Sequence, residues 1–451
     1  MGMTRRIGSS MQPMSRHAPV WMSWLTWGSV ASFYLIGFFQ RVAPAVMVDE
    51  LMREFQIGGA LLGNLSATYF YSYTVMQIPS GLLADGIGPR RLSAMAAFLT
   101  AVGTLMFGLA DHLWVAYAGR LLVGASVGVA FVTCMKLAGH WFPANRFATV
   151  TGVALLLGNF GGVLAGVPLS EAVSAFGWRA SMVVSAAFTF AMAAVIWAVV
   201  RDDPRERGFT SFVHASVIEK GSLPPMRALR TVSAQRETWL LLAASGLSAA
   251  PVLVFAGLWG VPYLTQVYGF ERTHAAALTS TMLVSWAVGG PTLGAMSDRL
   301  GRRKLPYLTA NVATATLWGV FLFWGDIPRI LLGPLFAAIG FTSGALIIGY
   351  AHSREANHPG AAGAVAGVVN MGPLGFAAVM QPLLGSILDR HWDGLLVNGV
   401  RIYDAGAYSA AFLWLFLSAC LSVAAASFTR ETYCRVRKFD EAGPCRSRRI
   451  P

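Results

Sequence analysis

The sequence predicts an all-α membrane protein that crosses the bilayer many times. Of its 451 residues, 55% are hydrophobic and only 12% are charged, whereas roughly a quarter of an ordinary soluble chain is charged. The apolar residues fall in blocks of about 20, the length of helix that crosses a hydrocarbon core of about 30 Å. Such long apolar runs exclude an outer-membrane barrel, because barrel strands alternate apolar and polar residues.

Twelve apolar runs predict twelve transmembrane helices in two six-helix halves, one on each side of the longest hydrophilic interruption. The predicted spans are 21–47, 59–80, 92–109, 113–138, 147–167, 178–200, 238–264, 275–296, 305–324, 330–351, 361–388 and 406–428. The predicted units are an N-terminal tail (1–20), an N-terminal half (21–200), a linker (201–237), a C-terminal half (238–428) and a basic tail (429–451).

The basic residues indicate the orientation of the chain. Most of the 34 lysines and arginines lie on the side of the predicted membrane that also holds both termini. By the positive-inside rule this side is the cytoplasm. The formal charge of +13 therefore reflects topology, and we expect a monomer in the cytoplasmic (inner) membrane with no nucleic-acid partner. The four cysteines are scattered, so no disulfide, metal site or cofactor is expected.

A loop motif occurs once in each half. GLLADGIGPRRL (81–92) recurs as GAMSDRLGRRKL (294–305), in both cases after the second span of the half. Duplicated helical units are typical of secondary transporters, so the repeat predicts two pseudo-symmetric halves. A carboxylate in such a loop can cap a helix or pair with an arginine. The motif residues are Gly81, Asp85, Gly88 and Arg90 in the first copy, and Gly294, Asp298, Gly301 and Arg302 in the second.

These loops, together with RLLVGASVG (120–128) and WFPANRFATVTG (141–152), resemble those of the major facilitator superfamily. The segments 38–55 and 64–85 are similar to the branch that contains anion:cation symporters and organophosphate antiporters. The resemblance implies a central cavity between the halves. It also implies that the loop motifs act as a conformational latch on the cytoplasmic side, with static helix capping as the alternative reading.

Three basic residues lie inside predicted spans, while every Asp, Glu and His falls in a loop or at a span edge. A charge in the membrane core costs several kcal/mol and is retained where it faces a cavity or a partner. Arg41 and Arg120 therefore predict an anionic substrate as their counter-charge. The alternatives are snorkelling for Arg41 and interhelical hydrogen bonding for Arg120. Lys136 is expected to be an exit-side attraction or a snorkelling anchor.

Polar and aromatic residues in the spans complete the predicted substrate site. Each could contact substrate, or could form helix–helix hydrogen bonds or belong to the interfacial aromatic belt. These candidates are Gln40, Tyr69, Tyr73, Asn159, Trp259, Tyr263 and Asn370, with Gln381 as a further buried amide.

The sequence departs from its relatives where their coupling groups lie. Gln40 and Val127 stand where many anion:cation symporters carry carboxylates, and the seventh span lacks the arginine of organophosphate antiporters, which disfavours a phosphate ester. Exchange, facilitated diffusion, or co-transport of a proton on the substrate itself remain possible. Asp49, Glu50 and Glu54 are expected in solvent at the end of the first span.

The predicted function is secondary transport of a small organic anion, a carboxylate, by alternating access, with or without a co-transported proton. A zwitterion such as an amino acid or small peptide is an alternative substrate, and a non-transporting solute sensor is an alternative function. An enzyme is not expected, since no span core offers a His, Asp or Glu for acid–base chemistry.

Overall fold

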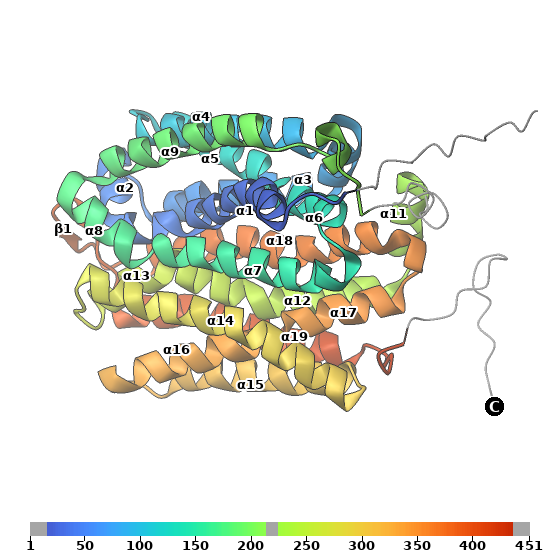
Figure 1. Ribbon diagram of the computed structural model, residues 1–451. Helices are drawn as coiled ribbons and strands as arrows, with labels where there is room; N and C mark the ends of the chain where they lie inside the picture. The colour runs from blue at the N-terminus through green and yellow to red at the C-terminus, as the bar shows by residue number, and fades with distance from the viewer. Residues whose placement is uncertain (1–15, 213–223, 436–451) are drawn as a thin grey trace, which may run out of the picture.

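The computed structural model describes residues 16–212 and 224–435, and this part of the chain is almost entirely helical. Its helices run roughly parallel to one another in two groups, one above the other in Figure 1. One short antiparallel pair, β1 (Leu396–Val397) and β2 (Val400–Arg401), joins the last two long helices. The all-α fold class is confirmed.

The first group, called here the N half, spans α1 to α9. Its elements are α1 (Val20–Val42), η1 (Ala43–Val46), α2 (Val48–Phe55), α3 (Gly59–Ile87), α4 (Pro89–Gly108), α5 (Leu113–Val127), α6 (Ala130–Trp141), η2 (Ala144–Arg146), α7 (Phe147–Leu164), α8 (Val167–Phe176) and α9 (Trp178–Val199). The connection to the second group contains η3 (Pro204–Arg207) and α11 (Pro225–Ser233).

The second group, the C half, spans α12 to α19. Its elements are α12 (Arg236–Val254), the π-helical η4 (Phe255–Trp259), α13 (Gly260–Gln266), α14 (Arg272–Leu300), α15 (Lys304–Phe323), α16 (Arg329–Ser343), α17 (Leu346–Ala356), η5 (Pro359–Ala361), α18 (Ala362–Arg390), β1, β2 and α19 (Ala405–Ser427). Residues 1–15 and 436–451 of the predicted tails, and 213–223 of the predicted linker, lie outside the described residues.

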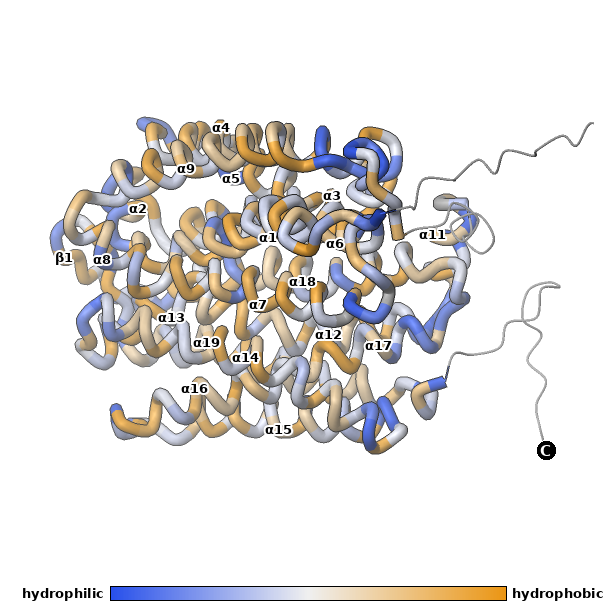
Figure 2. Tube along the Cα trace, viewed as in Figure 1, coloured by the Kyte–Doolittle hydropathy of each residue, from blue (hydrophilic) through white to orange (hydrophobic). Residues whose placement is uncertain are grey.

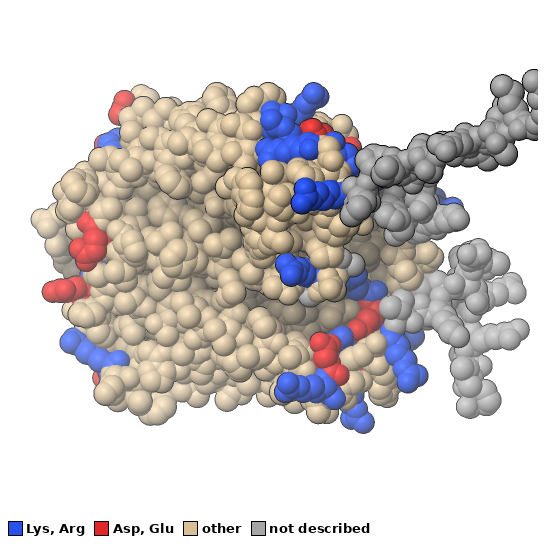
Figure 3. Space-filling model, in the orientation of Figure 1, with Lys and Arg blue, Asp and Glu red and all other residues tan. Residues whose placement is uncertain are grey.

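Ten of the predicted spans correspond to helical segments that are long and apolar enough to cross a membrane. The other two predicted spans fall in α3 and α14, which have 29 residues each. Hydrophobic residues cover the middle of the bundle in Figure 2, and charged side chains gather at its two ends in Figure 3. The chain is a multi-pass membrane protein.

Two helices continue beyond the predicted spans in the same direction. The predicted span 59–80 continues as helix to Ile87, and the predicted span 275–296 continues to Leu300. Both loop-motif aspartates therefore lie within the last turns of long helices. A helix can extend beyond the hydrocarbon core when polar side chains on its last turns reach water or partners.

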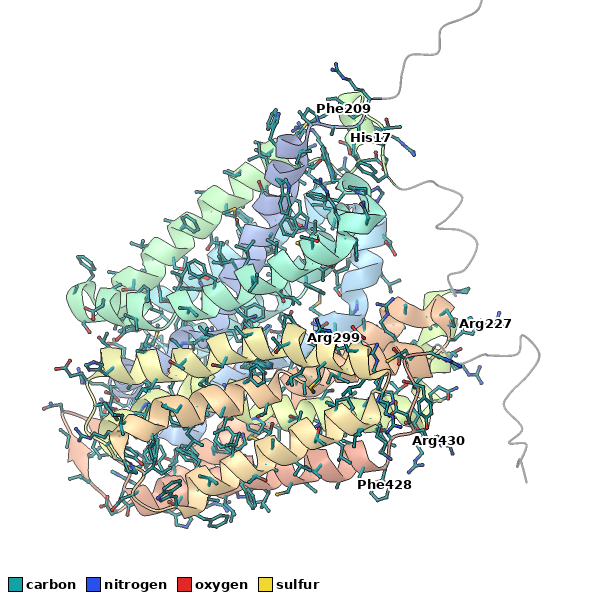
Figure 4. The ribbon with its side chains drawn as sticks, turned by 60° about the horizontal axis from the view of Figure 1, so that its bottom comes forward. His17, Phe209, Arg227, Arg299, Phe428 and Arg430 are labelled. Carbon is teal, nitrogen blue, oxygen red and sulfur yellow. The ribbon has the colours of Figure 1, made fainter. Side chains whose placement is uncertain are left out.

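Backbones of the two halves come closest at one end of the bundle. We call the end of the bundle at which α11 lies the linker end, and the opposite end, at which β1 lies, the far end (Figure 1). At the far end, a Cβ added to Gly59 would lie 2.9 Å from the Gly385 carbonyl oxygen, and one added to Gly63 would lie 2.5 Å from that of Gln381. The helices of the two halves diverge toward the linker end in Figure 4.

Candidate functional site

The Arg41 guanidinium lies in the interior of the bundle among aromatic rings. Arg41 is only 6% exposed and lies in the last turn of α1. Its guanidinium carbon is 4.2 Å from the ring centre of Phe38, 5.3 Å from that of Tyr73 and 5.8 Å from that of Tyr69. Cation–π attraction partly offsets desolvation of the charge. The Arg41 Nε atom is buried without a hydrogen-bond partner, so the site retains an unused donor.

Arg120 serves a different purpose from Arg41. It is 1% exposed, and its Nη1 donates to the Gln40 carbonyl oxygen at 2.6 Å. In a regular helix that carbonyl would accept from the backbone N–H of residue 44, which here is Pro44 and has none. Arg120 thus satisfies a carbonyl that proline leaves free, as the interhelical alternative anticipated. Its Nε and Nη2 atoms remain buried and unpartnered.

Neither arginine has an acidic partner among residues 16–212 and 224–435. The ion pairs in this part of the chain, such as Lys136–Asp85 and Arg272–Glu50, lie near one end of the bundle or the other. Both guanidiniums approach the ring of Tyr69, Arg120 at 5.2 Å from its centre. The interior of the N half therefore holds two positive charges around one phenol.

Three predicted site residues lie at or beside this pair. Tyr69 donates its hydroxyl to the Gly37 carbonyl at 3.0 Å, and its ring stacks on that of Tyr73 at 5.8 Å. Gln40 instead donates to the Ser185 hydroxyl of α9 at 3.1 Å. The Gln40 side chain thus joins two helices of the N half.

The C half contributes a polar contact to the same region. Tyr350 of α17 donates its hydroxyl to the Asn370 side-chain oxygen at 2.6 Å, and the Asn370 amide donates to the Gln77 side-chain oxygen at 3.0 Å. Gln77 belongs to α3, so this chain of bonds crosses between the halves. Tyr350 also interacts electrostatically with Arg41 and Tyr73. The sequence reasoning named Asn370 but missed Tyr350 and Gln77, which no motif or charge marks.

The remaining candidates lie elsewhere. Asn159 donates to the Leu155 carbonyl one turn earlier in its own helix. Trp259 is fully buried and donates to the Gln381 backbone carbonyl at 3.2 Å, and both residues belong to the C half. Tyr263 packs among aromatic rings and lines a cavity of about 470 Å³ at the far end of the C half. The described hydrogen bonds and ring contacts of these three residues go to groups other than the arginine pair.

The first loop motif bonds within the N half. Asp85 forms an ion pair with Lys136 at 2.8 Å, and Lys136 also donates to the Ala84 carbonyl. Lys136 is therefore a partner of the first loop motif. Arg90 donates to the Trp197 carbonyl, and its backbone N–H donates to Asp202. A Cβ added to Gly81 would find no atom within 4 Å.

The second loop motif bonds within the C half. Arg303, 8% exposed, pairs with Asp298 at 2.6 Å and with Glu355 at 2.9 Å. Gly301 has φ +62° and ends α14 in the left-handed conformation that glycine adopts at low cost. The Arg302 carbonyl accepts from the Ser297 hydroxyl, and Gly294 faces Ile347 of the same half.

Of the three carboxylates predicted to lie in solvent near the end of α1, Glu54 is exposed but Asp49 and Glu50 are partly buried. Glu50 pairs with Arg272 of the C half at 2.6 Å, with side chains 20% and 25% exposed, and its Oε2 is buried without a partner. Glu54 pairs with Arg179 of α9 at 2.7 Å. Asp49 is half-buried and lines a small crevice that includes Arg272. Glu50 thus links the two halves at the far end.

No group of three or more metal-binding side chains occurs within the described ranges. Cys134, Cys420 and Cys434 are free thiols, and Cys445 lies outside the described residues.

The fold and the site together define a class of protein. Two bundles of long apolar helices enclose an interior cationic site, and they pack closely at the far end and diverge toward the linker end. Such an arrangement belongs to multi-pass carriers built from repeated helical units.

Comparison with known proteins identifies the family. Residues 30–373 match the family model of the Major Facilitator Superfamily, and the chain belongs to that superfamily. It is therefore a membrane transport protein by family and not an enzyme. The predicted resemblance to this superfamily is confirmed.

Several curated relatives align with most of the chain. A probable sulfoacetate transporter of Cupriavidus necator is 24% identical over 66% of this chain and 68% of the relative. A probable hexose phosphate transport protein of Chlamydia muridarum is 23% identical over 81% of this chain and 85% of the relative. A membrane sensor protein of Escherichia coli is 22% identical over 86% and 90%, respectively.

A solved structure shows the same fold. A bacterial homologue of the human lysosomal transporter Spinster, in an inward-facing and unoccupied conformation, superposes with a TM-score of 0.70. The match covers 91% of this chain and 96% of the other, at 16% sequence identity.

Proposed function

We propose that this protein is a secondary transporter for a small organic anion that carries a carboxylate, and that the two halves expose the arginine pair alternately to the two sides of the inner membrane. The observation that carries the proposal is Arg41, a buried guanidinium with an unpartnered Nε that lies against the rings of Phe38 and Tyr73. A carboxylate would supply the missing acceptor and counter-charge. The relatives named for sulfoacetate and hexose phosphate also carry anionic solutes, which supports an anion here.

The two halves would hold different parts of the substrate. Arg41 and Tyr73 come from the N half, whereas Tyr350 and Asn370 come from the C half. An anion between them would take its charge pairing from one side and neutral hydrogen bonds from the other.

We propose that the termini lie in the cytoplasm, because the basic residues gather at the linker end (Figure 3).

A thermal-shift screen of organic acids, phosphates, sugars and amino acids on the purified protein would test the substrate class. Arg41→Gln should weaken binding of the best organic acid by about tenfold to a hundredfold, since a charge-assisted contact contributes about 1.5–3 kcal/mol. Arg227→Gln, which removes an exposed charge in α11, is the matched control. Equal binding by wild type and Arg41→Gln, or a neutral sugar as the best ligand, would reject the proposal.

A sensor is the second candidate function, because the sensor protein of Escherichia coli matches nearly the whole chain. A sensor would bind the same anion at Arg41 without net flux. Uptake of the anion into proteoliposomes that contain the purified protein distinguishes the two functions.

A further inference from the structure

Asp389, in the last turn of α18, bonds to the first turn of a helix that belongs to the other half. Its Oδ1 accepts from the backbone N–H of Gly59 at 2.8 Å, and its Oδ2 accepts from that of Ala60 at 2.8 Å. These N–H groups open α3, where backbone donors have no partner within their own helix. A carboxylate at this position also interacts favourably with the helix dipole.

The C half holds this carboxylate in place. Tyr403 donates its hydroxyl to Asp389 at 2.7 Å and accepts the Gly59 N–H at 3.0 Å, and Arg401 pairs with Asp389 at 3.1 Å. Tyr403 is 1% exposed, so its position is fixed by packing. The side chains that accept hydrogen bonds from the first N–H groups of α3 therefore belong to one cluster of the C half, formed by Asp389, Arg401 and Tyr403.

The start of α3 can approach this cluster only because its first residues are small. A Cβ added to Gly58 would lie 2.7 Å from both carboxylate oxygens of Asp389 and from an Arg401 nitrogen.

Other side-chain caps come from within a half. Asp404 caps α19 through the Ala407 N–H at 2.8 Å, and Glu431 accepts the Arg303 N–H at 2.7 Å. Separation of the halves at the far end would break the Asp389 cap but neither of the others.

We propose that Asp389, Arg401 and Tyr403, together with the backbone of Gly58–Ala60, form a latch that holds the far end closed. The proposal rests on the proposed alternation of the two halves. When the far end opens, the hydrogen bonds from the Gly59 and Ala60 N–H groups to the Asp389 carboxylate must break. Both partners must then bond to water instead. The latch thereby sets how readily the site opens at this end.

Amide hydrogen exchange of the full-length protein, with no solute added, tests the latch. Asp389→Ala should accelerate exchange at Gly59 and Ala60 by roughly five- to thirtyfold, the range expected for loss of a helix cap. The exchange rates in η1 (Ala43–Val46) and η4 (Phe255–Trp259) should also rise, because these two segments pack against each other across the halves. Asp404→Ala, the matched control, should accelerate exchange only at the start of α19.

Acceleration confined to Gly59 and Ala60 would overturn the latch and leave a static cap. If Asp389→Ala does not fold, Tyr403→Phe decides the question in the same way, because it removes one hydroxyl and keeps the ring. An unchanged exchange rate at η1 and η4 in Tyr403→Phe would then count against the latch. These readouts need no substrate, so a failure to transport organic anions would leave the latch intact, and the reverse also holds.

Discussion

The far end and the linker end are held by different kinds of contact. At the far end, polar contacts cross between the halves. They include Glu50–Arg272, the Arg53 bond to the Asn398 carbonyl at 3.0 Å and the Thr273 bond to Glu171 at 2.7 Å. At the linker end, the described contacts of both loop motifs stay within one half. If the halves alternate as proposed, the far-end contacts and the deeper Asn370–Gln77 bond must break and re-form, while the contacts of the loop motifs move with their own half.

The largest effect is expected from Gly385→Ala. A Cβ on Gly385 would overlap the Gly59 carbonyl of the other half, and backbone cannot yield as a flexible side chain can. Overpacking of this kind costs about 1–3 kcal/mol, which should favour the conformation open at the far end. A cysteine at Ser280, buried beside Gly166 at the interface, should then react faster with an impermeant thiol reagent.

Gly81→Ala is the control for this substitution. Gly81 lies in the first loop motif with free space at its Cβ position, so the variant should label as the wild type does. Equal labelling in Gly385→Ala and Gly81→Ala would mean that the close contact between α3 and α18 does not control opening.

A double-mutant cycle would show whether the Glu50–Arg272 pair holds the far end. Both side chains are mostly buried, and Glu50→Gln with Arg272→Gln should give a coupling of about 1 kcal/mol in the equilibrium between open and closed far ends. Glu54 and Arg179 form a similar pair within the N half, so the corresponding cycle should show no coupling in that equilibrium. Equal coupling in both cycles would contradict the comparison between contacts that cross the halves and contacts that do not.

Acidification of the far side should favour the closed far end. Burial raises the pKa of Asp49 above its ordinary value of about 3.9, and the neighbouring Glu50 raises it further, while Arg272 and Arg53 oppose both effects. When the far end opens, Asp49 gains water and its pKa falls toward the ordinary value. The closed state therefore binds the proton more tightly, and this preference is lost as the pH rises through the raised pKa.

Distances between spin labels at Phe176 and Ile330, two exposed far-end positions on opposite halves, would follow this equilibrium. Asp49→Asn should remove the pH dependence. A response that persists in Asp49→Asn would assign the titration to another group.

The smallest effect is expected at the linker end. Asp85 is 78% exposed on its side chain, so its pair with Lys136 should contribute at most about 1 kcal/mol to folding. If the motif forms a latch in the opposite conformation, Asp85→Asn should shift the balance toward the closed far end, and Lys136→Met should not. The same spin-label distances measure both variants, and identical shifts would favour a structural role for the pair.

The sequence was sufficient for the fold and for the interior charges. Long apolar runs predicted the helices, and the absence of acidic residues from the span cores predicted that Arg41 and Arg120 would lack a carboxylate partner, as the described structure shows. Partners that lie on other helices could not be predicted in this way. The pairing of Glu50 with Arg272 depends on how two helices from opposite halves meet, which leaves no local pattern in the sequence.

A helix irregularity lies at two of the candidate site residues. The π-helical turn at Phe255–Trp259 inserts an extra residue per turn and rotates everything that follows relative to regular helical spacing. Regular helical spacing therefore does not predict which face of the seventh span carries Trp259 and Tyr263. Pro251 and Pro262 flank this turn in the sequence, but neither shows where the helix changes to π-helical spacing.

The bond from Arg120 to the Gln40 carbonyl links occupancy of the site to the shape of α1. An anion that draws Arg120 toward itself leaves that carbonyl without a donor, and Pro44 cannot replace the lost bond. The segment of α1 that contains this carbonyl also carries Arg41. It leads directly into η1, which packs on the C half. Anion binding in the N half and packing between the halves thus depend on one short stretch of chain. The effects of substituting Arg41 and Arg120 on anion affinity should therefore not be additive.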